Sequence, residues 1–231
     1  MDGLPISVVI PTLDEAELIE SAVSSVLAAE GVECIVVDGG SRDHTRERAA
    51  RAGAKIAHAP RGRAPQLNTG ARLALHPLIV FLHADTILPP GYEHVVRRIL
   101  SGPNIACGAF RLRIEPANSS LRVIARIANL RARRLALPYG DQALFVRADR
   151  FHQLGGFPDL PVMEDFEFVR RIRRTGRVEI APEAVATSSR RWRRNGTWRT
   201  TLLHQLTVLA YLGGIPAATI ARWAARDRSS G

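Results

Sequence analysis

The sequence predicts an α/β protein in which helices cover both faces of a mostly parallel central sheet. Unbroken runs of β-branched and aromatic residues, such as residues 79–82, are typical of strands buried on both faces, which occur in sheets flanked by helices. Such runs alternate along the chain with helical patterns. The strongest run ends abruptly in His83 and Asp85, and polar groups that follow a parallel strand lie at the carboxyl edge of the sheet, where α/β proteins bind ligands.

Composition limits the organisation and the partners of the chain. With 231 residues, 46% of them hydrophobic, and no linker-like change of composition, we expect one domain. The net charge is +10 although Lys55 is the only lysine, so arginine supplies the positive charge. This charge fits either a solvated surface or attraction to nucleotide phosphates, lipid phosphates or an acidic membrane. Cys34 and Cys107 lie in apolar, strand-like runs and are expected to be reduced core residues.

Targeting and membrane signals are weak in this chain. No basic segment, apolar segment and cleavage site follow Met1, so a secretory signal is not predicted. The longest apolar stretch, residues 206–221, is interrupted by Gly213, Gly214 and Pro216 and is not expected to span a membrane. We expect a cytoplasmic protein, and peripheral contact with the inner face of the membrane is left open.

The first unit is a strand followed by a helix. The strand at residues 6–10 stops at Pro11, and Asp14 with Glu17 three residues later has the form of a capping box. A helix is therefore expected to begin there and to end near Gly31. The loop between the two elements should face the crevice at the carboxyl edge of the sheet.

The second unit begins with a strand at residues 34–38. It ends in Asp38, a carboxylate placed to accept hydrogen bonds from a ribose or a base. A helix through Arg51 and a short strand at residues 54–57 follow. Neither G-x-G-x-x-G nor G-x-x-x-x-G-K-[ST] occurs, which disfavours a dinucleotide-binding oxidoreductase and a P-loop protein.

Residues 61–70 are expected to open the helix that precedes the central strand. Arg61 and Arg63 beside its N-terminus form either an anion site or solvated loop positions. At the end of the central strand, Asp85 is placed to hold a metal or a ligand hydroxyl. The alternative is that Asp85 caps the turn at residues 89–91.

The middle of the chain predicts one helix, one strand and a basic helix. After a helix at residues 92–100, a strand at residues 106–114 alternates apolar residues with Arg111 and Arg113, which predicts a strand with one wet face rather than a central one. The segment 121–137 is a basic amphipathic helix, expected to lie on its own domain or on an acidic membrane.

The last third carries polar signals between short elements. Residues 140–142 precede a strand at 143–146, a short helix and a Gly155-Gly156 break, and Glu164-Asp165 then open a helix that continues through residue 174. Two short strands are expected around Pro182. The basic run 189–196 is either a solvated loop or a contact with a ligand. Two helices, at about 198–212 and 216–225, complete the chain, the first with an apolar stripe.

Three motifs together resemble a known family. Residues 7–15, 36–45 and 81–85 match, in order and spacing over roughly the first hundred residues, the nucleotide-binding motifs of family 2 glycosyltransferases with the GT-A fold. A small bacterial subgroup of that family also carries the pattern of Arg63, Gln66, Asn68 and Gly70, and the His-Ala-Asp form of the D-x-D motif. The resemblance implies a Rossmann-like sheet flanked by helices, with C-terminal helices after it.

The resemblance also implies roles for individual residues. Asp165, the second residue of an E-D pair after a Gly-Gly-Phe segment, matches the catalytic base, and Asp85 matches the ligand of a divalent metal, Mn²⁺ or Mg²⁺. The implied nucleotide-sugar contacts are Pro11, Thr12, Asp14, Glu15, Asp38, Gly40, Arg63, Gln66, Asn68, His83, Ala84 and Asp85. The implied acceptor contacts are Asp141, Gln142, Glu164 and Trp192, and the implied diphosphate contacts are Arg191 and Arg194.

One departure from the family pattern concerns the metal. His83 stands where the D-x-D motif has its first aspartate, so a hard oxygen ligand that Mg²⁺ or Mn²⁺ would prefer is lost. His83 is then a metal ligand, a ribose contact or a space-filling residue. The alternative to a metal held by Asp85 and phosphate oxygens is weak or absent metal dependence.

The function that the resemblance implies is the transfer of a hexose-type sugar from a nucleotide-diphosphate sugar to a hydroxyl group, with inversion at the anomeric carbon. The favoured donor is a UDP- or GDP-sugar, and the identity of the acceptor is unknown. Residues 1–115 would form the nucleotide-sugar half, 116–197 the acceptor and catalytic half, and 198–231 the C-terminal helices. A nucleotidyltransferase is disfavoured because its Gly-rich first loop with Arg and Lys is missing. A non-catalytic basic protein that binds nucleic acid or anionic lipid is the other alternative, although no nucleic acid is expected for the transferase.

Overall fold

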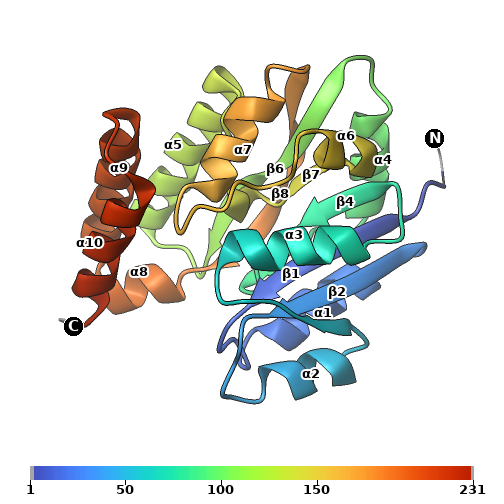
Figure 1. Cartoon of the computed structure of the whole chain (residues 1–231), viewed down its shortest axis with the longest axis horizontal. Coiled ribbons are helices and arrows are strands. Elements are labelled where there is room, and N and C mark those ends of the chain that lie inside the picture. The colour runs from blue at the N-terminus through green and yellow to red at the C-terminus, as the bar shows by residue number, and fades with distance from the viewer. Residues whose placement is uncertain (1–2, 230–231) are drawn as a thin grey trace.

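One mixed sheet forms the middle layer of the molecule, with helices on both faces (Figure 1). The computed structural model describes residues 3–229. Within these residues the sheet has eight strands in the order β3-β2-β1-β4-β7-β6-β8-β5. The α/β class and the flanking helices are as predicted. The sheet is parallel from β3 to β4, whereas β7 runs antiparallel to both β4 and β6.

The parallel half carries the predicted N-terminal units. Its strands are β1 (Ile6–Thr12), β2 (Val32–Asp38), β3 (Lys55–His58) and β4 (Leu78–Phe81), joined by α1 (Ile19–Leu27), α2 (Thr45–Arg51) and α3 (Arg63–Leu73). Successive side chains of a strand point to opposite faces. Ile6, Val8 and Ile10 therefore pack in the core under α1, and Val9 packs in the core under α3.

The second half of the sheet is mixed. It consists of β7 (Leu144–Arg147), β6 (Ile105–Glu115), β8 (Arg177–Ser188) and β5 (Thr86–Ile87). Around it lie α4 (Tyr92–Leu100), α5 (Ser119–Leu135), the 3₁₀ turn η1 (Gly140–Gln142), α6 (Ala148–Gln153) and α7 (Glu164–Ile172), followed by α8 (Arg190–Asn195), α9 (Thr197–Leu212) and α10 (Ala217–Ser229).

The strand β6 is only partly as predicted. Its C-terminal half has the expected wet face, because Leu112 and Ile114 are buried while Arg111 and Arg113 are exposed. Its place is central, however, since it lies between β7 and β8. The buried face is covered by α5, and the amide of Asn129 accepts from the N–H of Leu112 at 2.7 Å and donates to its carbonyl at 2.9 Å.

Three local predictions are corrected. The helix α1 begins at Ile19, because the Asp14 carboxylate accepts the N–H of Arg42 instead of capping that helix. The residues around Pro182 form one strand, β8, in which a register shift between the partners of Ala109 and Arg111 accommodates the proline. The basic run forms the helix α8 rather than a loop. One further element, the two-residue strand β5 directly after Asp85, was not predicted from the sequence.

The helices α9 and α10 lie at one side of the molecule (Figure 1). Rings and apolar side chains of α9 contact α7 and the segment before η1, in a small cluster formed by Tyr139, Met163, Phe166, Val208 and Tyr211. Within residues 3–229, no helix has an apolar stretch long enough to cross a bilayer.

Candidate active site

Gly140 is the point at which three segments of the candidate site meet. A Cβ on Gly140 would lie 3.0 Å from Asp165 Oδ2 and 3.0 Å from His83 Nε2, so these two atoms are at most about 6 Å apart. The N–H of Gly140 donates to Asp165 Oδ2 at 2.7 Å. Because any side chain would push these groups apart, only glycine fits this position without a shift. The end of β4, the turn η1 and the start of α7 thus converge here.

Asp165 is held by backbone donors at the start of α7. Its Oδ1 accepts the N–H of Phe166 at 2.7 Å, and its Oδ2 accepts from Gly140. Met163, the residue before the helix, has φ +70°, in the left-handed region that non-glycine residues rarely adopt. A helix N-terminus favours negative charge. The carboxylate is therefore fixed in orientation and lies in a favourable field.

Two further carboxyl groups of the site are strongly perturbed by burial. Burial raises the pKa of Glu164 to about 7, the charge of Asp165 adds to the rise, and Arg63 opposes it. Burial likewise raises the pKa of Asp141 to about 6, against the charges of Arg131 and Arg63. Buried oxygens of both residues, Glu164 Oε1 and Asp141 Oδ1, have no hydrogen-bond partner. Unpartnered buried polar atoms and shifted carboxyl groups are typical of functional sites.

Arg63 is the cation that faces these carboxylates. Its Nη1 lies 3.6 Å from Glu164 Oε1, while about half of its side chain is exposed. Burial and the charge of Arg63 lower the pKa of His83 to about 4. The imidazole is therefore neutral at pH 7 and offers a lone pair to a proton or a metal.

Asp85 is oriented by two threonines. Its Oδ1 accepts from the hydroxyl of Thr86 at 3.2 Å and from the hydroxyl of Thr187, on β8, at 3.5 Å. Its carbonyl accepts the N–H of Ser188 at 3.0 Å. Ala84, between His83 and Asp85, is buried. The short strand β5 thus fixes the end of the central motif against β8, a contact for which the sequence contains no signal.

The loops after β1 and β2 are tied to each other. Asp14, with φ +54°, donates its N–H to Ser41 Oγ at 2.9 Å and accepts from Arg42. The fully buried Asp38 carboxylate accepts the N–H groups of Gly40 and Ser41 and the hydroxyl of Ser41. Asp38 therefore orders its own loop.

The remaining residues of these loops lie at the same edge of the sheet. Pro11 and Thr12 end β1, and the hydroxyl of Thr12 is buried without a partner. Glu15 forms an ion pair with Arg190 at the start of α8. The carboxyl edge thus presents the expected loops, with α8 attached to them.

Three residues of the 63–70 pattern serve to position α3. The side-chain amide of Gln66 donates to the carbonyls of Thr12 and Val37, both at 2.8 Å. Asn68 bonds both the N–H and the carbonyl of Phe157, at 2.9 and 2.8 Å. A Cβ on Gly70 would lie 2.2 Å from Val9 Cγ1, so the helix approaches β1 too closely for any other residue. These contacts give Gln66 and Asn68 a structural role, and Arg63 alone of the predicted contacts in this pattern faces the carboxylates.

Some of the predicted acceptor and diphosphate residues also have a structural role, and others lie near the site. Gln142 is fully buried, donates to the carbonyl of Phe110 at 3.0 Å and accepts the N–H of Tyr139, so it holds η1 on β6. Trp192 packs on the apolar cluster of β6 and α5. The charge of Arg191 contributes, after burial and Arg63, to the lowered pKa of His83, which places it near the site. Arg194 is exposed on α8.

Metal-ligating groups are sparse at this edge. Among the described residues, no group of three or more His, Cys, Asp and Glu side chains is arranged to hold a metal ion. Asp85 and His83 are the two donors of the central motif. A divalent cation would have to complete its ligands with oxygens of a bound diphosphate or water. The donor set fits a cation that arrives with its substrate better than one held by the protein alone.

Similar proteins place these observations in a family. The model of the family described as Glycosyl transferase family 2 matches residues 7–152. An uncharacterized glycosyltransferase of Mycobacterium tuberculosis (strain H37Rv) is 30% identical over 113 residues, which are 48% of this chain and 51% of the relative. A protein of the same description from Mycobacterium bovis matches equally. The match thus spans about half the length of these curated relatives.

Solved structures share the fold. Glucosyl-3-phosphoglycerate synthase of Mycobacterium tuberculosis, in complex with Mn²⁺, UDP and glucosyl-3-phosphoglycerate, has a TM-score of 0.65 at 24% identity, over 93% of this chain and 81% of that chain. A mannosyltransferase of Pyrobaculum calidifontis, in complex with GDP-Man and Mn²⁺, has a TM-score of 0.62 at 20% identity, over 79% of this chain and 56% of that chain.

Proposed function

Because the chain belongs to glycosyl transferase family 2, we propose that it transfers a sugar from a nucleotide-diphosphate sugar to an acceptor hydroxyl, with inversion at the anomeric carbon. The observation that carries this proposal is the placement of Asp165. Two backbone N–H groups fix its carboxylate beside Gly140, with His83 and Arg63 nearby. A fixed carboxylate at a helix N-terminus suits a general base.

The chemical step is a single displacement. Asp165 takes the proton of the acceptor hydroxyl while the hydroxyl oxygen forms a bond to the anomeric carbon. The bond between that carbon and the diphosphate breaks, and the diphosphate leaves with the electron pair. Attack opposite the leaving group inverts the configuration. The positive charges of Arg63 and Arg191, both close enough to His83 to lower its pKa, would stabilise the negative charge that develops on the diphosphate.

The loops after β1 and β2 are the proposed site for the nucleoside. They lie at the carboxyl edge of parallel strands, where α/β sheets bind ligands. Asp14 joins the two loops through hydrogen bonds with Ser41 and Arg42, and Asp38 orders the second loop through Gly40 and Ser41. The complexes of the two similar structures with UDP and with GDP-Man support a nucleotide-sugar donor, a UDP- or GDP-sugar.

A divalent cation is the proposed cofactor, Mn²⁺ or Mg²⁺, and Mn²⁺ in both similar structures supports it. Asp85 would hold it, with neutral His83 as a second donor and diphosphate oxygens as the rest. The cation would supply charge neutralisation at the departing diphosphate. The hydroxyls of Thr86 and Thr187 keep Asp85 oriented for this contact.

The acceptor is proposed to lie on the side of Asp141 and Glu164. Asp141 Oδ1 and Glu164 Oε1 are buried without a hydrogen-bond partner, although Arg63 lies 3.6 Å from Glu164 Oε1, and both oxygens would accept from hydroxyl groups of an acceptor. With pKa values of about 6 and about 7, the two groups are partly protonated near neutral pH and can both donate and accept. Gln142 and Trp192 would act indirectly, since the first holds η1 and the second packs α8 on α5.

The test compares Asp165→Asn with the wild type. UDP-, GDP-, CDP- and dTDP-sugars are incubated with Mn²⁺ and candidate acceptors, and release of the nucleoside diphosphate is measured. Asp165→Asn should retain donor binding, measured by calorimetry, and lose turnover by roughly a hundred- to ten-thousand-fold, the range for loss of a general base. Glu167→Gln is the matched control, because Glu167 lies on the same helix and pairs with Arg170 and Arg171.

The same assay separates the alternatives. Equal loss of donor binding in Asp165→Asn would contradict the base role. Release of pyrophosphate from a nucleoside triphosphate would instead indicate a nucleotidyltransferase. Failure of every nucleotide to bind, with or without metal, would contradict the donor site altogether.

A further inference from the structure

The helix α9 presents its more apolar side to the solvent. Its buried residues are Thr200 and Val208, and its contacts with the body of the protein also include His204 on Tyr139 and Tyr211 on Phe166. The outer side carries a stripe at helical spacing, with 50% to 65% of each side chain exposed: Trp198, Leu202, Leu206, Leu209 and Leu212. A surface helix normally packs its apolar stripe and exposes its polar one. The exposed apolar stripe of α9 therefore indicates an interaction surface.

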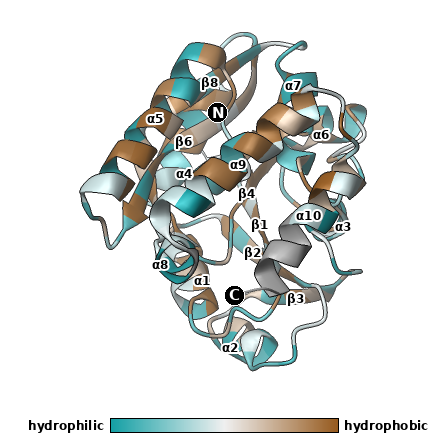
Figure 2. Ribbon diagram, turned by 90° about the vertical axis from the view of Figure 1, so that its left-hand side faces the viewer, coloured by the Kyte–Doolittle hydropathy of each residue, from teal (hydrophilic) through white to brown (hydrophobic). Residues whose placement is uncertain are grey.

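The neighbouring helix α5 adds a second exposed stripe. Leu121, Ile124 and Ala125 pack against β6, whereas Val123, Ile127 and Leu130 are exposed. Contacts join α5 to α9. In Figure 2 both helices face the viewer, and both carry hydrophobic segments on that side. We call the exposed side chains of these two helices the α5–α9 face.

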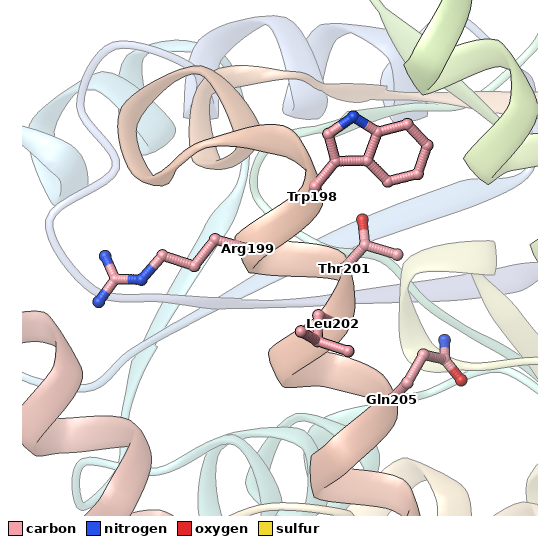
Figure 3. Close-up of a pocket in the computed structure, with 5 residues that line it drawn as sticks. All are labelled: Trp198, Arg199, Thr201, Leu202 and Gln205. Carbon is pink, nitrogen blue, oxygen red and sulfur yellow. The ribbon is translucent and has the colours of Figure 1, made fainter.

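Arginine surrounds this face. Residues 119–135 and 198–212 contain no aspartate or glutamate, and they carry five exposed arginines, Arg122, Arg126, Arg133, Arg134 and Arg199. Arg126 and Arg134 are exposed beside the stripe of α5. A shallow hollow on α9 is lined by Trp198, Arg199, Thr201, Leu202 and Gln205 (Figure 3). It contains none of the carboxylates of the candidate site. An exposed indole and a guanidinium beside leucines match the boundary between lipid headgroups and acyl chains.

We propose that the α5–α9 face docks on the surface of an anionic lipid bilayer. The leucines and the indole would enter the headgroup and acyl boundary, and the arginines would contact lipid phosphates. A second copy fits less well, because a symmetric contact would set this basic face against itself. A nucleic acid would pair with the arginines but leave the leucines in water. The proposed attachment is peripheral, through side chains of this face.

The test is flotation of the purified protein with vesicles. Phosphatidylcholine vesicles that contain phosphatidylglycerol are compared with phosphatidylcholine alone. We expect at least about tenfold stronger partition onto the anionic vesicles, with steep weakening by salt. Leu206→Gln with Leu209→Gln should lower this partition about tenfold or more, because both side chains are exposed and would enter the bilayer.

Charge variants locate the contact. Arg126→Gln with Arg134→Gln should lower the partition by about tenfold or more, since each arginine near an anionic surface favours binding. The matched control is Arg46→Gln with Arg51→Gln, which removes the same charge from exposed positions on α2, away from α5 in Figure 1. The control pair should bind vesicles as the wild type does. Circular dichroism and the melting temperature confirm that all variants are folded.

Three results would overturn the proposal. The first is the absence of binding to anionic vesicles. The second is equal loss of binding in the α5 and α2 arginine pairs, which would indicate attraction by net charge alone. The third is a stable dimer in sedimentation velocity that Leu206→Gln with Leu209→Gln dissociates, which would assign the face to a second copy.

Discussion

Arg190, at the start of α8, forms an ion pair with Glu15 in the loop after β1, although 175 residues separate them in the chain. The contact ties the C-terminal segment to the loop proposed to bind the donor. Burial raises the pKa of Glu15, while the bond from Arg190 opposes the rise.

Replacing Arg190 tests the strength of this tie. Arg190→Gln should lower the free energy of unfolding by roughly 0.5–1 kcal/mol, because the pair is partly exposed and screened by solvent. Urea denaturation measures the change. Glu17→Gln is the control, since Glu17 also approaches Arg190, at 3.7 Å, but is 82% exposed and should have no effect. A change as large in Glu17→Gln would show that general charge, rather than the Glu15 contact, is measured.

Gly140→Ala should separate turnover from donor binding. The added methyl group would meet Asp165 Oδ2 and His83 Nε2 at 3.0 Å and displace the proposed base. We expect turnover to fall by about tenfold or more, because small displacements of reacting groups are costly. Donor affinity, measured by calorimetry without Mn²⁺ so that the proposed His83 contact with the cation does not contribute, should change little. Unchanged turnover would mean that the base does not depend on this contact.

Gly70→Ala should lower the stability of the fold and leave turnover largely intact, in contrast to Gly140→Ala. Its methyl group would lie 2.2 Å from Val9 Cγ1 in the core beneath α3. Overpacking of this kind costs roughly 1–3 kcal/mol of stability. Thermal and urea unfolding should report the loss, and turnover at a permissive temperature should remain. A variant as stable as the wild type would show that α3 can move away from β1.

The raised pKa of Glu164 predicts that the free energy of unfolding decreases as the pH rises. Its pKa is about 7 in the folded protein and 4.5 ordinarily, so the folded state binds more protons between these values. The free energy of unfolding should therefore decrease from about pH 5 to about pH 8. Glu164→Gln should flatten this decrease, as measured by urea denaturation across the range. An unchanged slope in the variant would assign the pH dependence to other groups.

Asp85→Asn should remove the effect of metal on donor binding. If Asp85 holds the cation, Mn²⁺ should strengthen the stabilisation of the wild type by a UDP- or GDP-sugar, and chelation should weaken it. At a hundredfold excess of ligand over its dissociation constant, binding adds roughly 2.7 kcal/mol. Thermal shifts with and without Mn²⁺ measure the difference. Equal responses of wild type and variant to Mn²⁺ would contradict this role of Asp85.

The parallel half of the fold was predictable because its strands are buried on both faces. Continuous apolar runs mark β1, β2 and β4, and polar residues mark their ends. The Asp165 position was accessible too, since an acidic pair opens a helix there. The match to the family then supplied its implied role.

Long-range contacts could not be read from the sequence. Asn68 forms hydrogen bonds with the backbone of Phe157, 89 residues away. Every residue has these backbone groups, so the identity of Phe157 does not indicate the contact. The capping box at Asp14 failed for a related reason, because a loop amide of Arg42 competes for the same carboxylate. Gly140 precedes the predicted site residues Asp141 and Gln142 in the sequence. Its importance could not be predicted, because it depends on the positions of His83 and Asp165 in the fold.

The order of the strands sets a requirement on synthesis of the chain. In the sheet, β7 lies between β4 and β6, and β8 lies between β6 and β5. When only the residues up to Glu115 have emerged from a ribosome, β4, β5 and β6 therefore expose edges that later strands must cover. The sheet that carries the site can close only after Arg147 and Ser188 have followed, and until then the open edges can pair with strands of other chains.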